Sequence, residues 1–158
     1  MDKIVKYGVV VADPAEKMAI LVAAMLRGLG HRMVTMASTA REVHNLLIAR
    51  SYSLIIIDDA LGPPGVLEEI RRMRTDPAHP NRTTPIILVS ATPSVASIAA
   101  ARDAGVSEVV KKPFSTADLQ KRIEALDIFP RNFIEAPDYA GPDRRRKTMT
   151  IGDDDQRQ

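Results

Sequence analysis

The stretch Leu54-Ile55-Ile56-Ile57-Asp58-Asp59 is a run of large aliphatic side chains that ends in two carboxylates. Two similar apolar runs lie at Gly8–Ala12 and Pro85–Val89. Their apolar character is continuous rather than alternating, which indicates strands buried on both faces and hence a parallel sheet. Two weaker strands are expected at Met33–Met36 and Glu108–Val110.

A segment of helical periodicity follows each predicted strand. The expected helices are Ala15–Leu29, Ala40–Arg50, about Gly65–Arg74, Val95–Ala104 and Thr116–Leu126. The last begins after Ser115, with Asp118 three residues on, a start similar to a capping box. Strict alternation of strand and helix predicts an α/β fold with a doubly wound, five-stranded parallel sheet. We assign residues 1–127 to this domain.

Length and composition limit the classes of protein. The chain has 158 residues, 45% of them hydrophobic, enough for one ordinary core with about 30 residues left over. The absence of cysteine excludes a disulfide framework and a thiolate metal site. A formal charge of +2 is too small to indicate DNA binding by the whole molecule. No apolar run approaches the ~18 residues of a membrane span, so we expect a cytoplasmic protein without membrane insertion.

Polar residues stand where four of the predicted strands end. They are Asp13, Asp58 with Asp59, Ser90 and Lys112. Ligands of such sheets bind beyond the carboxyl ends of the strands. A phosphoryl group in transfer spreads negative charge over its oxygens and is stabilised by Mg²⁺, a cation and a hydrogen-bond donor. This set of side chains therefore indicates a phosphoryl pocket.

Each of these residues also has a structural interpretation. Asp13 precedes Pro14 and could serve as a turn former or helix cap. Ser90 could cap its strand, and Lys112 could simply offset the charge of Asp58. A carboxylate at the end of a buried strand costs desolvation unless a cation meets it, so Asp58 favours a functional role.

The order of these residues, together with Lys112-Pro113-Phe114, resembles the response-regulator receiver family, whose fold is flavodoxin-like or CheY-like. The resemblance covers about residues 3–127. It implies that Asp58 accepts a phosphoryl group, which Ser90 and Lys112 contact. It also implies that Asp13, Asp58 and Ala60 bind Mg²⁺. A receiver is a signalling and binding protein rather than a metabolic enzyme, and its partner would be a histidine kinase or phosphotransferase.

Three features depart from the family pattern. Ala12-Asp13 supplies one acid where receivers usually have two, so we expect weak Mg²⁺ binding. Val109 replaces the aromatic residue of the fifth strand whose rotation accompanies phosphorylation in many receivers. The loop at 59–65 is one residue shorter than usual and holds two prolines. Phosphorylation therefore need not be the main input.

Residues 128–158 form a compositionally distinct, arginine-rich extension. Prolines at 130, 137 and 142 exclude a long helix, so we expect an irregular tail that is disordered or becomes ordered on binding a ligand. Arg144-Arg145-Arg146-Lys147 is a dense basic cluster, followed by Asp153-Asp154-Asp155. The simplest interpretation is a solubilising end, and such tails also bind RNA or anionic membranes nonspecifically.

A more specific interpretation starts from the chemistry of arginine, which stacks on bases, forks to guanine O6 and N7, and binds phosphate. Tyr139 adds a stacking surface, and Asp143 could accept hydrogen bonds from guanine N1 and N2. The segment from Tyr139 to Lys147 resembles that of stand-alone CheY-like effectors, which bind cyclic di-GMP through an arginine-rich extension and act on the flagellar motor. The resemblance implies that Tyr139, Asp143, Arg144, Arg145 and Arg146 contact the nucleotide.

Three hypotheses follow. The first is a module that binds cyclic di-GMP through its tail and then docks on a protein partner such as a motor component. The second is a phosphoacceptor in a histidine–aspartate relay, which Asp58, Ser90 and Lys112 favour. The third is a degenerate receiver that serves as a scaffold.

Overall fold

The computed structural model describes residues 8–62, 65–128 and 132–145. Five strands form one parallel sheet in the order β2-β1-β3-β4-β5, as the sequence predicts. These strands are β1 (Val9–Ala12), β2 (Val34–Ala37), β3 (Leu54–Asp58), β4 (Ile86–Ser90) and β5 (Glu108–Lys111). The helices are α2 (Glu16–Gly28), α3 (Ala40–Ala49), α4 (Val66–Thr75), α5 (Val95–Ala104) and α6 (Thr116–Ile128). The α/β fold with a doubly wound parallel sheet is confirmed.

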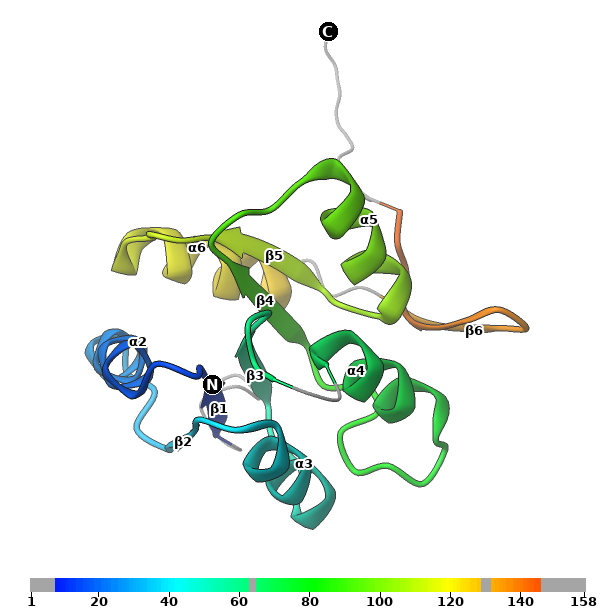
Figure 1. Cartoon of the computed structure of the whole chain (residues 1–158), viewed down its shortest axis with the longest axis horizontal. Coiled ribbons are helices and arrows are strands. Elements are labelled where there is room, and N and C mark those ends of the chain that lie inside the picture. Colours follow the sequence, from blue (N-terminus) through cyan, green and yellow to red (C-terminus); the bar gives the residue numbers. More distant parts are fainter. Residues whose placement is uncertain (1–7, 63–64, 129–131, 146–158) are drawn as a thin grey trace, which may run out of the picture.

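Helices cover both faces of the sheet in Figure 1, with α2 and α6 on one side and α3, α4 and α5 on the other. Alternate residues of each strand therefore enter two cores. Val9 and Val11 pack with the α2 and α6 side, and Val10 and Ala12 pack with the other. Every residue of β1, β3 and β4 is buried, which explains their continuous apolar runs. Within the described residues, no helix combines the length and apolar character that crossing a bilayer requires.

The edge strand β2 carries the weaker sequence signal because it is only partly covered. It pairs with β1 alone, and Met36 stays 44% exposed. Capping residues define the helix starts more clearly. The Asp118 backbone N–H donates to Ser115 Oγ at 3.0 Å, and the Ser115 backbone N–H donates to Asp118 Oδ2 at 3.0 Å. This reciprocal cap of α6 is the one indicated by the sequence, and its backbone hydrogen bond lowers the pKa of Asp118.

The described part of the extension is more regular than the irregular tail expected from its prolines. Strands β6 (Phe133–Ala136) and β7 (Tyr139–Pro142) form an antiparallel hairpin in which Ala136 pairs with Tyr139. Pro137 and Asp138 are the two connecting residues, and Pro142 lies in the last pair of the hairpin. Proline excludes a helix but suits turns and the ends of edge strands, which accounts for the difference.

The hairpin lies beside α4 and α5, and β7 contacts both helices (Figure 1). Arg74 of α4 is 1% exposed. Its Nε donates to the Gly105 carbonyl at 3.0 Å and its Nη1 to the Arg82 carbonyl at 2.7 Å. Burial lowers the pKa of Arg74 to about 10, against the opposing influence of Tyr139. Arg82 in turn lies 4.9 Å from the ring centroid of Phe133 on β6. These contacts tie the hairpin to the α4 side of the fold.

Gly105, at the end of α5, is one of the points where this packing tolerates no side chain. Its φ is +110°, and a Cβ atom there would lie 2.7 Å from Arg74 Cγ and 3.3 Å from the Ala140 carbonyl oxygen. We expect Gly105→Ala to lower the free energy of unfolding by about 2 kcal/mol or more, because it combines backbone strain with a clash. Urea denaturation measures this change.

Gly28, at the end of α2, provides the matched control. A Cβ atom there meets nothing within 4 Å, so Gly28→Ala should stabilise the protein by about 0.5–1 kcal/mol. Equal denaturation midpoints for the two variants would contradict this account of Gly105.

Candidate functional site

Four polar residues from the carboxyl ends of the strands meet at one rim of the sheet. Asp58 and Ser90 are the last residues of β3 and β4, while Asp13 and Lys112 directly follow β1 and β5. Because β1, β3, β4 and β5 are neighbours in that order, their ends bring these side chains together. The convergence expected from the sequence is therefore present for Asp13, Asp58 and Lys112, which contact one another.

The Lys112 ammonium group bridges the two carboxylates. Its Nζ lies 2.9 Å from Asp13 Oδ2 and also contacts Asp58 Oδ2. Both aspartates are 4% exposed, whereas the Lys112 side chain is 21% exposed. Burial of an unpaired carboxylate is costly, so Lys112 makes this arrangement of acids possible. Two negative charges share one positive charge, which leaves the three groups with an excess negative charge.

The remaining carboxylate oxygens accept backbone hydrogen bonds. Asp13 Oδ1 accepts from the Ala15 N–H at 2.8 Å, at the start of α2. Asp58 Oδ1 accepts from the Ala60 N–H at 2.7 Å. Asp13 thus fills the structural role of a turn former in the turn that leads into α2, and it also belongs to the charged cluster. Each carboxylate is fixed in orientation, with one oxygen toward the backbone and the other toward Lys112.

Ser90 connects the end of β4 to the same rim. Its side chain is buried, and its Oγ accepts from the Thr92 N–H at 3.3 Å. Its carbonyl accepts from the Lys112 N–H at 2.9 Å. The backbone of Ser90 therefore holds the residue that carries the bridging ammonium group.

The carboxylates strengthen the charged form of Lys112. Burial acts to lower the pKa of Lys112, but the hydrogen bonds and charges of Asp58 and Asp13 outweigh it and raise this pKa above its usual 10.5. Lys112 is accordingly an ammonium cation at neutral pH.

The model of the response regulator receiver domain family matches residues 9–124, which include all four rim residues. The chain belongs to the response regulator receiver family. The receiver is 32% identical over 82 residues to the response regulator protein PmrA of Pseudomonas aeruginosa, a match covering 52% of this chain and 35% of PmrA. It is 29% identical over 120 residues to the transcriptional regulatory protein YkoG of Bacillus subtilis, a match covering 76% of this chain and 50% of YkoG. The matches thus span half or less of these relatives' lengths.

Solved structures share the receiver fold. The Francisella response regulator 1452 receiver domain is 26% identical, with a TM-score of 0.67 over 76% of this chain and 95% of that one. The chemotaxis protein CheY4 of Vibrio cholerae is 20% identical, with a TM-score of 0.67 over 75% and 96% of the two chains. The receiver domain of a sensor histidine kinase from Pseudomonas aeruginosa, solved with magnesium in its active-site cleft, is 24% identical, with a TM-score of 0.66 over 75% and 94%.

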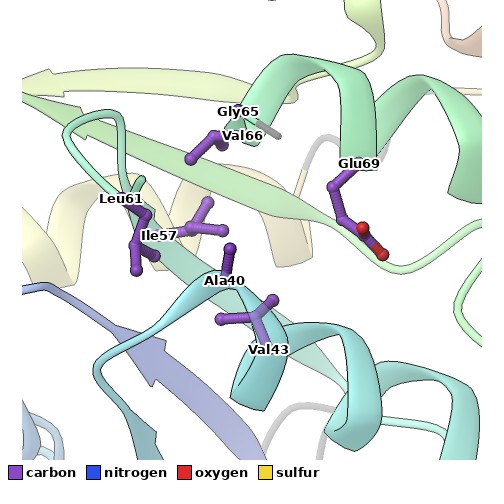
Figure 2. A pocket seen from close by; sticks show the side chains of 7 residues that line it. All are labelled: Ala40, Val43, Ile57, Leu61, Gly65, Val66 and Glu69. Carbon is purple, nitrogen blue, oxygen red and sulfur yellow. The ribbon is translucent and has the colours of Figure 1, made fainter. Parts of the chain in front are cut away.

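A small apolar hollow lies near the rim, between the start of α3, the loop after β3 and the start of α4 (Figure 2). Its volume of about 10 Å³ is the least that a single water molecule needs, so it accommodates no organic ligand. Glu69 lies at its border, and the carboxylate is held by His44 Nδ1 at 3.0 Å and Arg72 Nη2 at 3.4 Å. No cluster of three or more metal-ligating side chains occurs in the part of the receiver that the structure describes.

The hairpin brings together most of the tail residues singled out in the sequence. Tyr139 is buried, and its hydroxyl donates to the Pro142 carbonyl at 2.5 Å. The Arg144 guanidinium carbon lies 4.2 Å from the Tyr139 ring centroid. Arg145 donates through Nε and Nη2 to the carboxylate of Asp143. Arg146 lies outside the described residues.

The sequence gives no reason to expect a role for Asp103 of α5, yet its Oδ1 accepts from Arg144 Nη1 at 2.9 Å. The two residues are 41 positions apart. An exposed helical aspartate carries no sequence signal for such a pair, because the contact depends on where the hairpin packs.

The contacts of Lys112 with Asp13 and Asp58 can be tested by measuring the stability of a variant that lacks the ammonium group. Lys112→Met leaves two buried carboxylates without their cation, so we expect the free energy of unfolding at pH 7 to fall by about 3 kcal/mol. Because the pKa of Lys112 is higher in the folded state, its contribution is complete below pH 10.5 and disappears as pH rises through the raised folded-state pKa. Urea denaturation of both proteins across the alkaline range measures the difference. A difference that stays constant with pH would contradict the bridge.

Proposed function

We propose that this receiver accepts a phosphoryl group on Asp58 from a histidine kinase or phosphotransferase. The observation that carries the proposal is the contact of the buried Asp58 carboxylate with the Lys112 ammonium group. One oxygen of Asp58 is fixed by the Ala60 N–H, which leaves the Lys112-facing oxygen as the nucleophile. The receiver domain, 1–127, would carry this function, separately from the extension at 128–158.

The proposed step is a phosphoryl transfer. Asp58 Oδ2 attacks the phosphorus atom, the bond from phosphorus to the donor breaks, and the donor leaves with the electron pair. An acyl phosphate forms on Asp58. Lys112 then pairs with a phosphoryl oxygen in place of the carboxylate oxygen, and the Ser90 hydroxyl, at the end of the neighbouring strand, donates to the same group.

The residues at the rim fit Mg²⁺. Asp13 and Asp58 are hard oxygen ligands, and with Lys112 they retain an excess negative charge that favours a cation. Asp13, Asp58 and the Ala60 carbonyl would hold the ion, which supplies neutralisation of the charge on the transferred group. Two carboxylates, both of them also paired with Lys112, favour a dissociation constant in the millimolar range.

Acetyl phosphate with Mg²⁺ should add one phosphoryl group to the wild-type protein. Asp58→Asn should abolish this addition, because it removes the nucleophile. Asp59→Asn is the matched control, since Asp59 is the adjacent but exposed acid, and it should be phosphorylated like the wild type. Intact-protein mass spectrometry measures the product. Equal phosphorylation of all three proteins would overturn the assignment.

A second candidate function rests on the hairpin. We propose that the extension binds cyclic di-GMP through Tyr139, Asp143 and the arginines 144–146, and that the complex docks on a protein partner such as a component of the flagellar motor. The stack of Arg144 on Tyr139 favours it, because the same aromatic and guanidinium surfaces stack on guanine bases. The Arg145 side chain is 84% exposed and close to this stack in sequence.

Cyclic di-GMP should bind with a dissociation constant of about 1 μM or tighter, corresponding to roughly −8 kcal/mol. Cyclic di-AMP should bind more weakly by about 1–3 kcal/mol per base, because adenine presents an amino donor where guanine presents O6. Arg145→Lys should weaken binding, since lysine lacks the planar fork. Arg41→Lys, on the exposed surface of α3, is the matched control and should bind like the wild type. If titration calorimetry finds equal affinity for the two nucleotides, the tail binds them by nonspecific electrostatics and does not recognise guanine.

A further inference from the structure

We propose that Asp103 of α5 is an autoinhibitory residue that holds Arg144 in a closed position until an anionic ligand displaces it. The inference rests on the proposed binding of cyclic di-GMP by the extension. It assigns to the receiver surface a role in setting the affinity of that site.

Arg144 makes two contacts that occupy its guanidinium group. Its Nη1 donates to Asp103 Oδ1 at 2.9 Å, and its guanidinium group covers the ring of Tyr139. Recognition of a phosphate or a guanine edge by an arginine uses paired N–H donors, so Asp103 competes directly for them. The ring of Tyr139 is likewise closed to a base while Arg144 lies over it.

The surroundings of Asp103 strengthen the competition. A groove of about 380 Å³ is lined by residues of the hairpin, α4 and α5. Its lining includes the carboxylates of Asp103, Glu135 and Asp138 but a single arginine, Arg71. Glu135 already pairs with Arg82 Nη2 at 2.7 Å, so Asp103 is the carboxylate of this lining that attracts the guanidinium group of Arg144. The ligand must therefore draw Arg144 away from Asp103.

The expected size of the effect follows from exposure. The side chains of Arg144 and Asp103 are 43% and 62% exposed, and an exposed ion pair supported by one aromatic contact is only modestly stable. Because only the open fraction of the protein binds the nucleotide, a closed state of this stability weakens the apparent affinity by about two- to fivefold. Loss of the Asp103 charge should raise the affinity by the same factor.

The test compares three full-length variants by titration calorimetry with cyclic di-GMP. Asp103→Asn should bind two- to fivefold more tightly than the wild type, and Asp103→Glu, which keeps the carboxylate, should remain near the wild type. Asp138→Asn removes an equal charge from the hairpin turn and should change affinity by less than about twofold. Equal or weaker binding by Asp103→Asn, or equal gains in Asp103→Asn and Asp138→Asn, would overturn the proposal.

Limited trypsin cleavage after Arg144 separates this proposal from the one on which it rests. In the absence of nucleotide, Asp103→Asn should be cleaved there two- to fivefold faster than the wild type, because the open state is more populated. If no protein binds cyclic di-GMP, the proposed nucleotide function fails, and the cleavage rates still decide the closed position of Arg144. Equal cleavage rates would refute it.

Discussion

The ion pairs of Lys112 with Asp13 and Asp58 organise the functional rim of this receiver. Parallel strands β1 and β3 each deliver a carboxylate to the same edge, where burial and mutual repulsion oppose them. The ammonium group of Lys112, at the end of β5, offsets both effects. The hydrogen bond from the Lys112 N–H to the Ser90 carbonyl holds the Lys112 backbone against the end of β4. In the proposed function, the same ammonium group would pair with phosphoryl oxygens, because the cation that satisfies the carboxylates can also satisfy a phosphoryl group.

A second buried cation lies on the side of the receiver that the extension packs against. The guanidinium group of Arg74 on α4 bonds to the carbonyls of Gly105 and Arg82, and Arg82 in turn pairs with Glu135 of the hairpin at 2.7 Å. This close approach requires a residue without Cβ at the end of α5. The second strand of the hairpin begins at Tyr139, and the residues that follow it place Arg144 against Asp103 of α5. The basic cluster is thus anchored to a receiver helix at its first arginine.

The core strands could be predicted from the sequence because burial on both faces produces unbroken apolar runs such as 54–57. The proximity of Asp58 and Lys112 could be predicted because parallel strands end at one edge of the sheet. The pairing of Lys112 with both acids could not be predicted, since Asp13 had an equally good role as a turn former before α2, and it fills that role too. The prolines of the extension excluded a helix without revealing a hairpin, and the contact of Asp103 with Arg144 depends entirely on tertiary packing.

One ammonium group holds both carboxylates at the rim. Direct titration of the Lys112 side chain by heteronuclear NMR tests this arrangement, in the wild type and in Asp13→Asn and Asp58→Asn. The account predicts a Lys112 pKa above 10.5 in the wild type that falls in each variant, because each loses one of the two partners. A Lys112 that titrates at or below 10.5 in the wild type, or that does not respond to either substitution, would contradict it.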